Sequence, residues 1–268
     1  MKVKKLDKYA SASFLLMAGA VILIATGLVI NLGEFITAAF VISGTVCALT
    51  GIFILTFTRG ATVDPRYFGM LAAQWCKNMC VIEADLGIYG SAHFLPPRVT
   101  GESRVMQFNP TLTYGGGTVS AKEPFIKTET PGLIVTPCCD PWIQDLRKRN
   151  ALVIPPKKEE LIILINEIIG DVFGFASRVS GSWRDTTTVE LTFHGYRFID
   201  GCKAIAQESK KCCAMNPCPV CCLCGALIAE GTDTVVTLDK CSIHSSSPEV
   251  TVIFSMLPQR KVTLPPEQ

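Results

Sequence analysis

The chain has 268 residues, of which 49% are hydrophobic and only 18% are charged, and its formal net charge at pH 7 is +2. A nearly neutral chain lacks the basic field that attracts nucleic acid, so we expect no nucleic acid among its partners. The hydrophobic excess is concentrated near the N-terminus, which points to a membrane instead.

Two uncharged, mostly apolar segments lie on either side of Glu34, and each contains about 24 residues. A helix of that length crosses roughly 30 Å of hydrocarbon. We therefore predict a two-helix transmembrane hairpin over residues 1–58, with spans at about 9–31 and 36–57. The short turn between the spans requires the two helices to be antiparallel neighbours.

The positions of lysine and arginine predict the orientation of this hairpin. Several lysines precede the first span, Arg59 and Arg66 follow the second, and the turn contains only Glu34. Basic residues beside a span favour the cytoplasm. We expect a multi-pass protein of the cell membrane with both termini and the soluble domain in the cytoplasm. A cleaved signal peptide is the alternative for the first segment, although the second would still anchor the chain.

The rest of the chain is predicted to be a mixed α+β cytoplasmic domain at 66–257, between a linker at 59–65 and a flexible tail at 258–268. Helices are expected from Asp140 to about Asn150 and from Lys157 to Val172, where apolar residues recur at helical spacing. Strands are expected in the short apolar or alternating segments 104–108, 132–135, 151–154, 187–194, 234–238 and 249–256.

Cysteine is the most unusual component of the soluble domain, which holds twelve of the 13 cysteines. Cytoplasmic thiols stay reduced, so a cluster of them there favours metal binding or redox chemistry over disulfides. Outside the cell the same cysteines would be expected to form disulfides. The predicted compartment and the predicted cysteine chemistry therefore depend on each other.

One spacing of cysteine and histidine indicates a metal site. Cys218 and Cys221 form a Cys-x2-Cys pair, and Cys241 and His244 follow as Cys-x2-His after nineteen intervening residues. Such spacing is typical of structural zinc sites, in which four nitrogen or sulfur ligands surround the ion. Pro219 also predicts a helix that begins beside this first pair, where the helix dipole stabilises a thiolate. We therefore predict these four residues as ligands of a structural metal, with zinc first.

Other uses of the cysteines stay open. Cys212 or Cys213 could replace His244 as the fourth ligand, and Cys224 is a further candidate for metal or redox chemistry. Buried free cysteine also packs like a small hydrophobic residue, which is the simplest interpretation of Cys222 and Cys224.

Two redox alternatives concern the same segment. Cys218-Pro219-Val220-Cys221 is similar to the Cys-Pro-x-Cys of glutaredoxins, but it follows no βαβ pattern. Cys218, Cys221 and Cys224 also repeat every third residue as in the iron–sulfur motif of bacterial ferredoxins, without the Cys-Pro that completes that motif.

The segment from about Cys202 to Ser255, with its Cys218-Pro219-Val220-Cys221 and its strand ending at Cys241, resembles the C-terminal part of the vinyl-reductase, or hydrocarbon-binding, domain family. The resemblance implies an α+β domain, often dimeric, with a pocket for a hydrophobic small molecule. It also implies that Cys221 and Cys241 match cysteine positions of the family. The family has a further cysteine before the last strand, where this chain has Ser247-Pro248-Glu249-Val250. The whole chain also resembles uncharacterised archaeal membrane proteins.

We expect a membrane-anchored, non-enzymatic module that binds a structural metal and a hydrophobic small molecule or a protein partner. No nucleophile or phosphate-loop motif is present, so we predict no catalytic residue. His93 and His194 could act as bases but are interpreted as ordinary hydrogen-bonded histidines. The alternatives are a thiol redox or iron–sulfur protein that uses Cys218 and Cys221, and a structural subunit of a membrane complex or homo-oligomer. No ligand-binding residue is predicted.

Overall fold

The computed structural model describes residues 8–30, 33–58, 64–117, 119, 125–126, 131–150, 152–209, 211–244 and 247–257. Contacts between residues divide the chain into two compact units, Met1–Val63 and Asp64–Gln268. Most of the predicted linker at 59–65 and all of the predicted tail at 258–268 lie outside the described residues.

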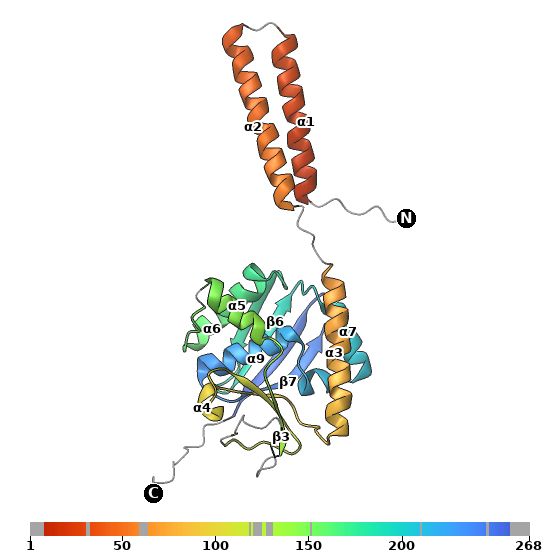
Figure 1. The fold of residues 1–268 in the computed structure, drawn as a ribbon, viewed down its shortest axis with the longest axis vertical. Helices are drawn as coiled ribbons and strands as arrows, with labels where there is room; N and C mark the ends of the chain where they lie inside the picture. The colour runs from red at the N-terminus through yellow and green to blue at the C-terminus, as the bar shows by residue number, and fades with distance from the viewer. Residues whose placement is uncertain are drawn as a thin grey trace. The chain divides into compact units, whose positions relative to one another are not determined.

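The first unit is a hairpin of two helices, α1 (Lys8–Val29) and α2 (Glu34–Thr58), which run antiparallel (Figure 1). Both are long and apolar enough, by length and composition, to cross a membrane. Small residues let them approach closely, as membrane helices require. Ser13 Oγ donates a hydrogen bond to the carbonyl oxygen of Gly51 at 2.5 Å. A side chain at Gly44 would collide with Ile24 of the facing helix.

The second unit is built on an eight-stranded sheet with the order β3-β4-β2-β1-β7-β8-β6-β5, and its strand pairs are antiparallel. The strands are β1 (His93–Leu95), β2 (Met106–Pro110), β3 (Phe125–Ile126), β4 (Gly132–Val135), β5 (Arg178–Trp183), β6 (Thr188–His194), β7 (Val236–Ile243) and β8 (Val250–Met256). The pair β1–β7 joins a half-sheet from the first part of the domain to one from the second part. The predicted mixed α+β class is confirmed.

The helical elements of this unit are α3 (Pro65–Asp85), α4 (Pro97–Thr100), α5 (Asp140–Asn150), α6 (Lys158–Asn166), the π-helical turn η1 (Glu167–Val172), α7 (Ile199–Glu208), α8 (Cys212–Met215) and α9 (Pro219–Thr232). The strand predicted at 151–154 is wrong for its described residues, Leu152 to Ile154. Leu152 and Ile154 lie in irregular backbone, and their partly buried side chains pack against the hydrophobic core. The prolines that follow at 155 and 156 lack the N–H group that a sheet ladder needs.

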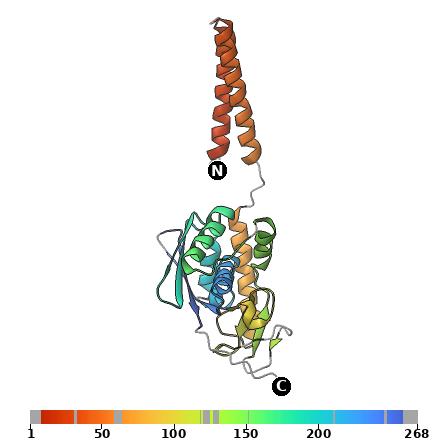
Figure 2. The same ribbon diagram turned by 90° about the vertical axis from the view of Figure 1, so that its left-hand side faces the viewer.

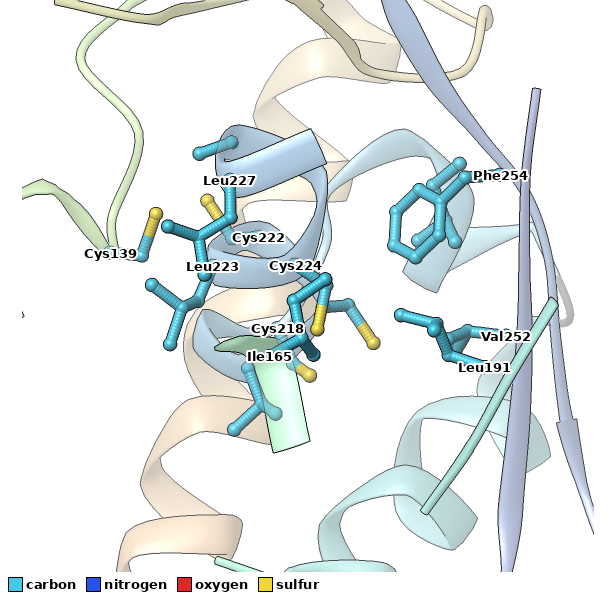
Figure 3. Packing of buried hydrophobic residues seen from close by; sticks show 14 of the residues in the cluster. Cys139, Ile165, Leu191, Cys218, Cys222, Leu223, Cys224, Leu227, Val252 and Phe254 are labelled. Carbon is cyan, nitrogen blue, oxygen red and sulfur yellow. The ribbon is translucent and has the colours of Figure 1, made fainter. Parts of the chain in front are cut away.

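Helix α9 is the centre of the domain in both views (Figures 1 and 2), and its residues from Val220 to Ala229 are buried on every side. A helix that is apolar all round belongs in a core rather than at a surface. Figure 3 shows Leu223 and Leu227 of α9 close to Cys139 and Ile165, with Val252 and Phe254 of β8 on the opposite side. This core position brings the cysteines of α9 into contact with several other elements.

Candidate metal centre

Five cysteine side chains converge at the N-terminus of α9. The Sγ atoms of Cys213, Cys221 and Cys241 all lie within 4.8 Å of one another. Cys218 is hydrogen-bonded to Cys202, Cys213 and Cys221, and Cys202 is also hydrogen-bonded to Cys241. Four sulfurs around a zinc ion lie roughly 3.8 Å apart, given Zn–S distances of about 2.3 Å in a tetrahedron. These five residues are called the thiol cluster below, and within it the Cys213, Cys221 and Cys241 sulfurs come close to the spacing of a metal site.

The start of α9 positions two members of the thiol cluster. Cys218 is the N-cap residue, with an extended backbone, and Pro219 occupies the first turn. Proline suits this position because its missing N–H group needs no partner there. Cys221 follows within the first turn, so both sulfurs lie at the positive end of the helix dipole. This part of the sequence prediction is confirmed.

A β-bulge in β7 positions Cys241. The ladder with β8 shifts register between Leu238 and Lys240, which leaves Asp239 as an extra residue. Strict alternation from the buried Leu238 would turn Lys240 toward the core. The extra residue instead turns Cys241 to that face, opposite the buried Val252. Without the bulge, an ammonium group would occupy the place of the thiol.

Cys202 and Cys213 come from two separate short helices, α7 and α8, that both contact β7. Both residues are buried. Cys202 stands alone in the sequence, ten residues before the next cysteine, so no spacing indicated that it would join the thiol cluster. The tertiary contacts of α7 alone bring it there.

Hydrogen bonds within the thiol cluster lower the pKa of some of its members and raise the pKa of others. Hydrogen bonds from Cys202 and Cys213 lower the pKa of Cys218 and that of Cys241 well below the ordinary thiol value. The pKa values of Cys202 and Cys213 are raised, because these hydrogen bonds hold their protons and burial disfavours their thiolates. The pKa of Cys221 is also raised well above the ordinary thiol value, first by its hydrogen bond with Cys213. Cys218 and Cys241 are thus the members of the thiol cluster that favour thiolate, the form of cysteine that binds metal.

A small cavity of about 30 Å³ lies against the thiol cluster. Three of the five cysteines, Cys202, Cys213 and Cys241, line it, together with Ile205 and Ile243 among others. The cavity adjoins the side of the thiol cluster that these three cysteines form.

The structure brings together three of the four predicted ligands, Cys218, Cys221 and Cys241. His244 lies elsewhere, because its side chain is exposed and its Nε2 atom is 2.9 Å from Thr251 Oγ1. The reason is the two-residue period of a strand: positions separated by three residues point to opposite faces. Of the alternative ligands, Cys213 lies in the three-sulfur group with Cys221 and Cys241.

The other cysteines form separate contacts around α9. Cys212 pairs with Cys80 of α3, and their Sγ atoms lie 2.7 Å apart. Cys222 is hydrogen-bonded to Cys138 and Cys139, and Figure 3 shows Cys139 beside Cys222. Cys224 is fully buried in the core. Cys212 and Cys224, predicted as alternative ligands, are thus outside the three-sulfur group.

Comparisons with protein-family models, with curated proteins and with solved structures gave no match. The resemblance to the vinyl-reductase family therefore stays a prediction. What the domain does has to be inferred from the geometry of the thiol cluster itself.

Proposed function

We propose that this protein is a membrane-anchored module whose soluble domain binds a soft metal ion, with zinc first, through the thiol cluster. The observation that carries the proposal is the mutual approach of the Cys213, Cys221 and Cys241 sulfurs to within 4.8 Å. Cys218 is the fourth ligand, because it is hydrogen-bonded to two of these three and its pKa is lowered. Thiolates select zinc, copper(I) or iron–sulfur clusters over hard cations such as magnesium.

The role of the metal is structural. A closed set of four protein sulfurs leaves no position for water or substrate, unlike a catalytic zinc site. The ion ties together α8, α9 and β7, which supply Cys213, Cys221 and Cys241. Helix α8 has only four residues, too few to be stable by itself. The free energy of metal binding would therefore contribute directly to the folding of this region.

The hairpin of α1 and α2 anchors the module in the membrane in this proposal. Its support is the length and apolar composition of both helices. The lysines before α1 favour a cytoplasmic domain, where the thiols stay reduced and available for metal. The resemblance of the C-terminal segment supports a hydrophobic small molecule as a further ligand of the domain.

Metal analysis of the full chain, purified without oxygen in detergent, tests the metal site. We expect about one metal ion per chain, and at least a tenfold loss of affinity in Cys221→Ser, because serine oxygen is a poor ligand for a soft ion. The matched control is Cys224→Ser, which removes another buried thiol of the same helix outside the cluster and should leave the metal content unchanged. A folded wild-type protein without bound metal contradicts the proposal.

A thiol redox function is the second candidate, favoured by the lowered pKa of Cys218 beside Cys221. Here oxidised glutathione would convert the two thiols to a disulfide and be reduced to two glutathione thiols. The same anaerobic preparation distinguishes the two functions. Metal-free protein that forms this disulfide reversibly favours redox chemistry, whereas metal-loaded protein that resists the oxidant favours the metal site.

A further inference from the structure

Helix α3 has two faces of different character. One face is buried in the domain through Gly69, Ala73 and Cys76, and the helix lies beside α7 (Figure 1). The opposite face is exposed and mostly apolar. Its apolar side chains, each between 50% and 73% exposed, are Tyr67, Met70, Leu71, Trp75, Val81 and Ile82. These six residues, together with the exposed Gln74 and Asn78, are called the outer face of α3 below.

The outer face of α3 is large for a monomeric protein. Six large side chains at these exposures present roughly 700 Å², whereas the largest apolar patch on a typical monomer covers about 300–600 Å². The two amide side chains bring the total close to the roughly 800 Å² that each partner contributes to a standard stable interface. Tyrosine, tryptophan and methionine are also enriched in such interfaces. The outer face of α3 therefore has the size and composition of a protein-binding surface.

The charges around this surface favour a neutral protein partner over a lipid surface. The outer face of α3 contains no charged residue. The basic side chains beside it are already paired with α7. Arg66 Nε lies 3.5 Å from Asp200 Oδ2, and Lys77 Nζ lies 3.2 Å from Glu208 Oε2. Helices that lie on a membrane present lysine and arginine to its anionic headgroups. A neutral face can instead meet an identical face without repulsion.

The spacing along the outer face of α3 suits a second copy of the same helix. Tyr67, Leu71, Gln74, Asn78 and Val81 recur at alternating intervals of four and three residues, which is the spacing of a seam between two parallel helices. Gln74 Nε2 donates a hydrogen bond to Asn78 Oδ1 at 2.8 Å. The Asn78 N–H groups and the Gln74 oxygen can then bond to their counterparts in a second copy. Amides in such a seam fix the register of a dimer.

The membrane anchor proposed above favours the same arrangement. It would give every copy one orientation, and only residues 59–64 separate the end of α2 from the start of α3. Two neighbouring copies can then place their α3 helices side by side in the same direction, at the high effective concentration that a shared membrane provides. We infer that the outer face of α3 binds the outer face of a second copy, in a parallel and symmetric dimer.

Photocross-linking of the full chain in membranes tests this dimer. Benzoylphenylalanine, a photoreactive amino acid, replaces Leu71 in a chain with one affinity tag, and a copy with a second tag is expressed beside it. Illumination should give a covalent product of twice the chain mass that carries both tags. The same amino acid at Ile163 of α6, which is 58% exposed outside the outer face of α3, should give no such product.

Trp75→Glu and Ile163→Glu are matched variants, because the two native side chains are 56% and 58% exposed. Trp75→Glu places an unpaired carboxylate within the interface and should lower the yield of the dimer cross-linked at Leu71 at least fivefold. Ile163→Glu should leave that yield unchanged. The readout does not depend on bound metal, so it is separate from the test of the metal site.

Each contrary outcome would overturn the inference. A product that joins the chain to a different protein would identify another partner for this face, and adducts with lipid alone would place the face on the membrane. No product from the Leu71 position, or equal yields in the Trp75→Glu and Ile163→Glu variants, would show that the outer face of α3 does not hold two copies together.

Discussion

At the scale of single residues, Glu83 of α3 is a buried carboxyl group with incomplete hydrogen bonding. It is 1% exposed, its Oε1 atom accepts a hydrogen bond from Asn109 Nδ2 at 3.1 Å, and its Oε2 atom has no partner among the described residues. Burial raises the pKa of Glu83 to about 7, against the opposing effect of the Asn109 hydrogen bond. The folded protein therefore binds this proton more tightly than the unfolded chain does.

This shift predicts a pH dependence of stability with a definite sign. The stabilisation from the tightly held proton is fully present below the unfolded pKa of about 4.3, is lost as pH rises toward 7, and is absent above it. Glu83→Gln, which is neutral at every pH, should raise the free energy of unfolding at pH 8 by on the order of 1–3 kcal/mol. Denaturant unfolding at pH 5 and pH 8 measures the difference.

The control for this prediction is Glu102→Gln, which neutralises an exposed carboxyl group of the same domain. It should follow the wild-type stability at both pH values. If Glu83→Gln retains the wild-type pH dependence, the carboxyl group is not the source of it.

Residue spacing predicted members of the thiol cluster only where neighbouring positions in the sequence share one local element. Cys218 and Cys221 could be assigned because a proline marks the start of α9 between them. Cys202 could not be assigned, because only the tertiary position of α7 brings it to the thiol cluster. His244 was predicted as a ligand, but a strand rather than a turn carries it away from Cys241, which lies on the opposite face.

At the scale of elements, the fit of α9 against β1 depends on the absence of a side chain at Gly225. A Cβ atom there would overlap the ring of Phe94, which is fully buried. Gly225→Ala should therefore lower the free energy of unfolding by about 1–3 kcal/mol through overpacking, despite the better helix propensity of alanine. Thermal or denaturant unfolding of the full chain measures this effect.

Gly170→Ala is the matched control, because the nearest atom to a Cβ there is 3.7 Å away, an ordinary contact. It should change stability by less than about 1 kcal/mol. Equal stability of the Gly225→Ala and Gly170→Ala variants would show that α9 can move away from Phe94 at no cost.

Element prediction succeeded where strong local signals exist. Asp140-Pro141 marked the start of α5, and the alternating segments near 187–194 and 249–256 form β6 and β8. Strand β5 was missed, because Ser180, Gly181 and Ser182 hide its alternation, and its place comes from pairing with β6. The order of the eight strands, including the β1–β7 junction, depends on long-range pairing that no local pattern encodes.

At the scale of the whole molecule, the proposal requires the domain that contains the thiol cluster to lie in the cytoplasm. A membrane-impermeant maleimide applied to intact cells should modify Glu34→Cys, at the start of α2, because the proposed orientation places the turn outside. The same reagent should leave Glu102→Cys, an exposed position of the domain, unmodified until the cells are lysed. Gel shifts relative to the wild-type chain measure both reactions.

Labelling of Glu102→Cys in intact cells would place the domain outside. The paired cysteines would then be expected to form disulfides, and the metal proposal would lose its chemical basis. Labelling of neither variant in intact cells would contradict a hairpin that spans the membrane.

The burial of α9 also affects how the protein is made. While the polypeptide is still emerging from the ribosome, every sulfur of this helix is open to oxygen and to wrong partners. Once the surrounding strands have closed over it, oxidants reach few of them. Folding of the domain therefore competes with the formation of incorrect disulfides during synthesis. A strongly reducing environment at that stage favours folding.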